Sequence, residues 1–271
     1  MNFAFLDSGT GGIPYMLYLK RKCPEMTCAY LGDTLHFPYG EKTPAQITGC
    51  ASQAVDLIMR KWNPQAVVVA CNTISVTALD NLRSSFPQIP IVGTVPAIKV
   101  AAEVSRNKRI GLLATNATVR HPYIKRLERD FASDCTVFSR GDADLVAFIE
   151  HDLFTATREQ KFDAVKPAVD YFAENGCDTI ILGCTHFIHM DDIIRQSAGS
   201  AVQVIDSREG VVRQALKVER AREPAEPHVL PSGEPPDDGA LFVTGFRQKK
   251  DADEYSVLCR NLNIKWGGIL S

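Results

Sequence analysis

The feature that most constrains the fold of this chain is a weak internal repeat. Residues 2–9, which end in Asp7-Ser8-Gly9, have a counterpart in residues 109–116, and residues 66–73, which contain Cys71, have one in residues 178–186, which contain Cys184. The two offsets are nearly equal, at 115 − 7 = 108 and 184 − 71 = 113. Each half therefore places a polar turn after one strand and a cysteine-containing turn after another, which predicts two similar α/β units.

Short apolar, β-branched runs alternate with longer segments of helical periodicity. Strands that are apolar throughout and separated by helix-length segments are typical of parallel sheets buried on both faces. The fold class predicted is α/β, with two pseudo-symmetric domains whose mainly parallel sheets are flanked by helices. The expected strands are 2–6, 27–31, 65–70, 89–92, 109–114, 135–138, 179–183, 201–205 and 241–244, and the expected helices are 12–21, 44–61, 75–85, 97–105, 119–131, 143–150, 158–174 and 207–223. Residues 223–238 are rich in proline and acids, and we expect an exposed loop there, before a last helix and strand.

Composition excludes several classes of protein. With 45% hydrophobic and 23% charged residues the chain is globular, and its net charge of −2 gives no basic field for nucleic acid. The apolar runs are strand-sized, so no membrane span is expected, and the first seven residues lack the basic region of a secretory signal. Eight cysteines without a Cys-x-x-Cys pair indicate a reduced, cytoplasmic protein.

Cys71 and Cys184 are the first candidates for chemistry, since each ends a buried strand and opens a turn. A single cysteine in such a place is more often just a small buried residue. Their equivalent positions in the repeat instead favour a pair of activated thiols, because a helix N-terminus and a nearby histidine stabilise a thiolate.

If the two units share a cleft at their strand ends, these two thiols lie on its opposite walls. One could then remove a proton from a carbon atom while the other delivers a proton to the opposite face, which inverts a stereocentre. Cysteine, with an ordinary pKa of about 8.5, can act as base in one direction and acid in the other near neutral pH. This scheme demands no cofactor, and no cofactor motif is found.

Two loops supply further polar groups. The turn 7–12 matches neither a P-loop nor a dinucleotide fingerprint, so Asp7 and Ser8 either serve a ligand or cap the following helix. The loop that contains Pro38-Tyr39-Gly40 follows the second expected strand, where binding residues collect. Tyr39 could orient a substrate or pack over the cleft, and both interpretations stay open.

Four short motifs occur together in this order and spacing over residues 1 to about 210. They are Leu6-Asp7-Ser8-Gly9-x-Gly11-Gly12, Tyr30-x-Gly32-Asp33 with Pro38-Tyr39-Gly40, Ala70-Cys71-Asn72-Thr73, and Gly183-Cys184-Thr185-His186. In these motifs the chain resembles the glutamate branch of the aspartate/glutamate racemase family. The resemblance implies two α/β domains, residues 1–94 with 208–271 and residues 95–207, with the active site in the cleft between them. It also implies cofactor-independent interconversion of L- and D-glutamate, which supplies D-glutamate for bacterial peptidoglycan.

The same resemblance implies roles for individual residues. Cys71 and Cys184 would transfer the protons, Asp7 would assist Cys71, and Glu150 and His186 would assist Cys184. Without the resemblance, Glu150 would be interpreted as a solvated acid at a helix end. The residues implied in substrate binding are Asp7, Ser8, Tyr39, Gly40, Asn72, Thr73, Thr115, Thr118, Thr185 and His186. We expect glutamate as the small-molecule partner, no metal, no nucleic acid and no membrane, with a homodimer as one candidate assembly.

Three alternatives stay open at this point. The same cysteines could racemise aspartate or a hydantoin. A zinc protein could use Cys71, Cys184, His186 and His189, although these residues lack the close paired spacing of a structural zinc site. The third is a binding protein without catalysis. The chain also departs from the family pattern at Phe187-Ile188-His189, where the family has an aromatic residue followed by proline.

Overall fold

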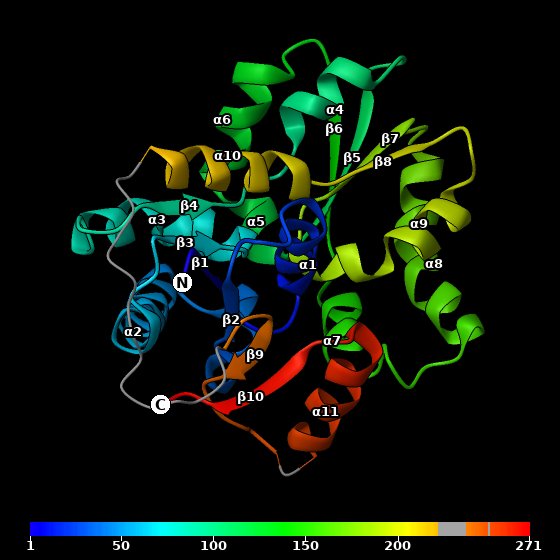
Figure 1. The fold of residues 1–271 in the computed structure, drawn as a ribbon. Coiled ribbons are helices and arrows are strands. Elements are labelled where there is room, and N and C mark those ends of the chain that lie inside the picture. The colour runs from blue at the N-terminus through cyan, green and yellow to red at the C-terminus, as the bar shows by residue number, and fades with distance from the viewer. Residues whose placement is uncertain (222–236, 249) are drawn as a thin grey trace. The chain divides into compact units, whose positions relative to one another are not determined.

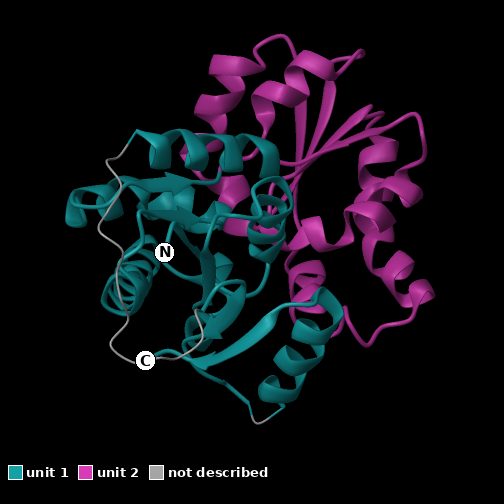
Figure 2. Ribbon diagram, viewed as in Figure 1, with its two compact units in different colours: residues 1–94, 208–271 teal, residues 95–207 magenta. Residues whose placement is uncertain are grey.

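The computed structural model describes residues 1–221, 237–248 and 250–271. These residues form two compact units, which Figure 2 distinguishes by colour: unit 1 contains residues 1–94 and 208–271, and unit 2 contains residues 95–207. The segment that forms unit 2 is thus inserted between two parts of unit 1. No helix in the described ranges is both long enough and apolar enough to cross a bilayer.

Unit 1 contains a six-stranded sheet in the order β10-β9-β2-β1-β3-β4, with all neighbouring strands parallel (Figure 1). Its strands are β1 (Phe3–Asp7), β2 (Cys28–Gly32), β3 (Ala66–Val69), β4 (Ile91–Gly93), β9 (Ala240–Val243) and β10 (Lys265–Ile269). Its helices are α1 (Ile13–Lys22), α2 (Pro44–Trp62), α3 (Asn72–Ser85), α10 (Arg208–Arg220) and α11 (Asp251–Leu262), with the 3₁₀ helices η1 (Thr34–His36) and η2 (Tyr39–Glu41).

The core of unit 1 follows from the alternation of side chains along buried strands. Ala4 and Leu6 of β1 belong to an apolar cluster with residues of α2 and α3, while Phe3 and Phe5 are fully buried outside that cluster. Both faces of the sheet are therefore covered at β1, as expected for a strand whose first four residues are apolar. Helix α2 begins with a capping box in which the Thr43 hydroxyl accepts from the backbone N–H of Gln46 and the Gln46 side chain accepts from the N–H of Thr43.

Unit 2 contains a four-stranded parallel sheet in the order β6-β5-β7-β8. Its strands are β5 (Arg109–Ala114), β6 (Thr136–Gly141), β7 (Thr179–Leu182) and β8 (Gln203–Ile205). Its helices are α4 (Ile98–Val104), α5 (Asn116–Arg120), α6 (Pro122–Phe131), α7 (Ala143–His151), α8 (Arg158–Glu174) and α9 (Asp191–Ala198), with the 3₁₀ helix η3 (Thr185–Met190).

The strand orders confirm the predicted pseudo-symmetry. The four neighbouring strands β2-β1-β3-β4 of unit 1 correspond in order to β6-β5-β7-β8 of unit 2. In each unit the first strand, β1 or β5, pairs with the second strand on one side and with the third strand on the other. This change of direction creates a switch point at the carboxyl ends of the strands. Asp7 ends β1 and Cys71 follows β3, while Thr115 follows β5 and Cys184 follows β7. The candidate residues thus lie at the switch point of each sheet.

The prediction of one helix over residues 119–131 was wrong. The chain forms α5 up to Arg120 and starts α6 at Pro122, with His121 between them in an extended conformation. Proline disfavours the helical conformation of the residue before it, so the helix must restart there. His121 then caps α6, because its ring nitrogen accepts from the backbone N–H of Tyr123 at 3.2 Å.

The structure differs from the sequence prediction in two other segments, helix α9 and the loop at 223–238. Helix α9 was not predicted at all. A last helix and strand were expected without bounds, and they are α11 and β10. Most of the loop expected at 223–238 lies outside the described residues. Its last two positions are half-buried rather than exposed, because Asp237 accepts from the Trp62 indole N–H at 2.7 Å and Asp238 accepts from the backbone N–H of Cys28 at 2.9 Å.

Candidate active site

In unit 1 a hydrogen-bonded series leads from Cys71 to Asp7. Cys71 is 4% exposed, and its thiol donates to the Ser8 hydroxyl at a long sulfur–oxygen distance of 3.9 Å. The Ser8 backbone N–H donates to the Asp7 carboxylate at 2.7 Å, and the Ser8 hydroxyl lies 3.3 Å from the same oxygen. Ser8 therefore lies between the Cys71 thiol and the Asp7 carboxylate, and the assistance of Cys71 by Asp7 stays a prediction.

The glycine-rich turn brings these groups to the end of β3. Gly12 is the N-cap residue of α1 and no side chain caps that helix, so Asp7 and Ser8 do not serve as its cap. A Cβ atom on Gly12 would lie only 2.6 Å from the carbonyl oxygen of Ala70, which explains why glycine is needed there. The turn is further fixed by Tyr30, whose hydroxyl accepts from Gly12 N–H and donates to the Gly9 carbonyl.

Tyr39 lies in the same unit and is almost completely buried. Its hydroxyl donates to the Asp33 carboxylate, which also accepts from the Thr244 hydroxyl at 2.7 Å. Burial and the adjacent Asp33 carboxylate raise the pKa of Tyr39 far above its ordinary value, so the phenol is a neutral donor at physiological pH. The structure shows the hydroxyl of Tyr39 engaged with Asp33, and the half-buried Gly40 follows it in η2.

Asn72 and Thr73 begin α3 directly after Cys71, and both are buried. Among the described residues, neither the side-chain oxygen nor the side-chain nitrogen of Asn72 has a hydrogen-bond partner. Because an unsatisfied buried amide costs about 1–3 kcal/mol, such a group is a strong indication of a ligand position. The N-terminus of α3 adds backbone N–H groups and a positive dipole end that suit a carboxylate.

In unit 2 the corresponding thiol belongs to a series with a histidine and a carboxylate. Cys184 follows β7, and its sulfur lies 3.7 Å from Nδ1 of His186, while Nε2 of His186 lies 2.8 Å from the carboxylate of Glu150. All three side chains are at most 5% exposed. Glu150 ends up buried because it lies on the inner side of α7, a helix capped by Asp142. The interpretation of Glu150 as a solvated acid, which the sequence favours without the resemblance, is therefore wrong.

The charge state of His186 follows from these two contacts. Burial lowers the pKa of the imidazole, but its hydrogen bonds with Cys184 and Glu150 outweigh that effect and raise the pKa well above the usual range. The protonated imidazole of His186 therefore lies between the Glu150 carboxylate and the Cys184 sulfur.

The remaining predicted residues of unit 2 lie near the starts of two helices. The Thr115 hydroxyl caps α5 by accepting from the backbone N–H of Thr118 at 3.2 Å, and it donates to the Thr118 hydroxyl at 3.0 Å. Thr185 is buried in the first position of η3. The segment that lacks the family's proline forms this 3₁₀ helix without a break, and the ring of His189 there contacts Phe154 edge-on.

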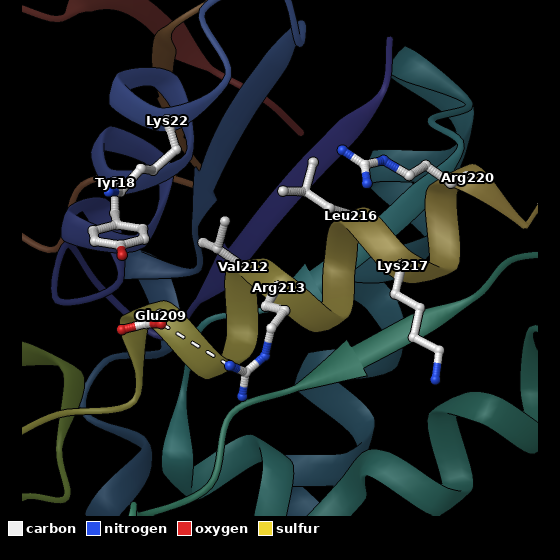
Figure 3. Close-up of a pocket in the computed structure, with 8 residues that line it drawn as sticks. All are labelled: Tyr18, Lys22, Glu209, Val212, Arg213, Leu216, Lys217 and Arg220. Carbon is white, nitrogen blue, oxygen red and sulfur yellow. Dashed lines mark ion pairs between the residues drawn. The ribbon is translucent and has the colours of Figure 1, made fainter.

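A separate pocket of about 480 Å³ lies between α1 and α10 in unit 1 (Figure 3). Tyr18, Val212 and Leu216 provide its apolar part, and lysine and arginine side chains surround it. None of the eight lining residues is one of the predicted site residues.

The sequence analysis did not find Thr244 as a partner of Asp33, because the pairing of β2 with β9 that unites them spans some two hundred residues.

The two parallel sheets share one strand order, and a buried cysteine follows an inner strand of each sheet. A model of the Asp/Glu/hydantoin racemase family matches residues 18–215. The chain belongs to this family, whose members are isomerases.

Its relatives include a glutamate racemase of Treponema pallidum, 37% identical over 99% of this chain and 96% of the relative, and one of Shewanella piezotolerans, 39% identical over 78% of each chain. Among solved structures, the Escherichia coli glutamate racemase in complex with L-glutamate and the activator UDP-MurNAc-Ala has a TM-score of 0.83. It is 26% identical to this chain, and the alignment covers 99% of this chain and 97% of the other.

Proposed function

We propose that this chain interconverts L- and D-glutamate without a cofactor, using Cys71 and Cys184 as its two proton-transfer groups. The observation that carries the proposal is the equivalent placement of two buried thiols, one after β3 and one after β7, each hydrogen-bonded to polar partners. The relatives that match nearly the whole chain are glutamate racemases, which favours glutamate over aspartate or a hydantoin.

In this reaction one cysteine, as thiolate, takes the α-proton from one face of the substrate. The electron pair left on the α-carbon spreads onto the carboxylate oxygens, where preorganised donors stabilise it. The other cysteine, as thiol, then gives its proton to the opposite face, and the two sulfurs have exchanged protonation states. The scheme requires both thiols to reach the same α-carbon, and the reverse reaction uses the same groups in exchanged roles.

The polar groups around each thiol suit an amino acid with two carboxylates and an ammonium group. We assign the two carboxylates of glutamate to hydroxyl, amide and backbone N–H donors of Asn72, Thr73 and Thr185, because a chain with a net charge of −2 must bind anions locally. Asp7 would accept from the substrate ammonium, with Ser8 beside it. Tyr39 and Gly40 would complete the site in unit 1, and Thr115 and Thr118 would contribute in unit 2.

The direct test follows deuterium uptake at the α-carbon in D₂O while circular dichroism monitors the substrate. We expect L-glutamate and D-glutamate each to converge on the racemic mixture, with deuterium at the α-carbon of the product. L- and D-aspartate serve as matched substrates one methylene shorter. Racemisation of aspartate with none of glutamate would contradict the assignment of glutamate, and absence of α-deuterium with every substrate would contradict the reaction itself.

Asn72 gives a second test, which separates binding from folding. Replacement by leucine removes an unsatisfied buried amide, so we expect the free energy of unfolding to rise by about 1 kcal/mol while KM for glutamate increases at least about tenfold. Urea titration and steady-state kinetics measure the two effects. Ser75→Ala in the same helix is the control, because the Ser75 hydroxyl accepts from the backbone N–H of Thr94 at 2.8 Å and its loss should lower stability. An unchanged KM for Asn72→Leu would argue against a substrate contact.

We further propose that the D-glutamate made by this chain supplies peptidoglycan synthesis in the cytoplasm, as the family resemblance implies. A homodimer is the assembly we propose, and sedimentation equilibrium of the purified protein would test it.

A further inference from the structure

A cluster outside the proposed reaction brings together three side chains of different chemistry. One ligand atom each from Asp33, His36 and Cys50 lies within 4.8 Å of the other two. Asp33 follows β2, His36 ends η1 and Cys50 lies on α2, so all three belong to unit 1. Asp33 is 1% exposed, whereas His36 and Cys50 are partly exposed, which leaves the cluster accessible from solvent.

The geometry is close to that of a metal centre. Nδ1 of His36 lies 2.9 Å from each oxygen of the Asp33 carboxylate. Two nitrogen or oxygen ligands about 2.0 Å from a tetrahedral zinc ion are separated by about 3.3 Å, so a small rotation of the imidazole would admit the ion. Carboxylate, imidazole and thiolate are together the ligands that zinc and neighbouring divalent transition metals prefer.

The hydrogen bonds to the Asp33 carboxylate also fit a metal centre. The hydroxyls of Tyr39 and Thr244 donate to separate oxygens of Asp33 and thereby fix its orientation. Hydrogen bonds of this kind orient the ligands of most metal sites and strengthen the binding of the ion. An ionised carboxylate accepts more than one contact per oxygen, so these donors and a metal ion can be accommodated together.

We propose that Asp33, His36 and Cys50 form a binding site for a divalent transition-metal ion of the zinc class, with water at the remaining coordination positions. On binding, the thiol of Cys50 gives its proton to solvent and its sulfur becomes a ligand. The ion would connect η1 with α2 and thereby brace the segment between them, which contains Tyr39. This site shares no residue with the Cys/His set of the zinc alternative considered from the sequence.

Metal binding itself, rather than activity, provides the test. We expect the purified protein to bind one Zn²⁺ at this site in competition with a chromogenic chelator, and His36→Ala and Cys50→Ser each to weaken that binding at least about tenfold. Cd²⁺ as a probe should give a thiolate-to-metal charge-transfer band that Cys50→Ser loses. Cys23→Ser is the matched control, since Cys23 is also partly buried, free and in unit 1, and it should bind as the unaltered protein does.

Either of two results overturns the proposal: no binding of Zn²⁺ or Cd²⁺ by the unaltered protein, or unchanged affinity in either His36→Ala or Cys50→Ser. Circular dichroism establishes that the variants fold, and the Cd²⁺ spectrum of the unaltered protein stands as a test even if one of them does not. Because no assay of racemisation enters, failure of this proposal is distinct from failure of the proposed reaction. Zinc held only by Cys71 or Cys184 would be recognised by its persistence in both variants.

Discussion

Replacing either Cys71 or Cys184 with alanine will lower kcat/KM for both glutamate enantiomers by at least about 10³-fold. Each thiol supplies one of the two proton transfers, and a positioned acid or base contributes about 10²–10⁴-fold. The remaining thiol can still remove a proton from one face, so each variant should exchange the α-proton of one enantiomer only. The two variants should differ in which enantiomer that is. Mass spectrometry of each recovered enantiomer from D₂O measures this.

Cys177→Ala is the control for this experiment. Cys177 is a buried cysteine of unit 2, and burial raises the pKa of its thiol to about 11, so it is a poor proton-transfer group near neutral pH. We expect the Cys177 variant to keep racemisation within about twofold, provided that urea titration shows it folded. Two-way racemisation at the original rate in the Cys71 or Cys184 variant would refute the two-base scheme.

The second large effect is expected for Glu150→Gln. The substitution removes the negative charge 2.8 Å from Nε2 of His186, so the pKa of that imidazole should fall toward its usual range. The thiolate of Cys184 loses its cationic neighbour, and we expect kcat to drop by about 10²-fold. Because the imidazolium of His186 then persists only to lower pH, an acid shift of the alkaline limb of the kcat profile distinguishes this effect from simple misfolding. Glu103→Gln, at an exposed acid of α4, should leave the profile unchanged.

The same group makes stability depend on pH. The pKa of His186 is raised in the folded protein, so the stabilisation from its proton is fully present below the unfolded value of about 6.5 and is lost as pH rises through the folded pKa. We expect the free energy of unfolding to decrease with pH above about 6.5, and less steeply in Glu150→Gln. Urea titrations at a series of pH values measure both slopes, and equal slopes would contradict the role assigned to Glu150.

Much of the fold could be predicted because inner strands such as β1, β3 and β7 are mainly apolar and the repeat ties the two halves together. The strand order matched the repeat because β1 and β5, and β3 and β7, carry the corresponding motifs. The break at Pro122 was missed because helical periodicity continues across it, and only the restriction on the residue before proline reveals it. Helix α9 is short and begins directly after η3, so its periodicity was too brief to detect.

The site was predictable to a different extent in each unit. Cys71, Cys184 and His186 follow strand ends, which a sequence pattern reveals. The burial of Glu150 and its approach to His186 depend on how α7 packs, and without the family resemblance the residue looked solvated. The cluster of Asp33, His36 and Cys50 was not found at all, because the hydrophobic pattern of α2 does not show which half-buried position faces η1.

The discontinuity of unit 1 has a consequence for the order in which the nascent protein matures. Strand β2 acquires its outer neighbour β9 only when residues 240–243 have left the ribosome. All of residues 95–207 emerge before that, so the inserted unit can complete its sheet while the unit that was started first still presents a bare edge. Unpaired edges template pairing with other chains, so the edge of β2 is open to such pairing until β9 has formed.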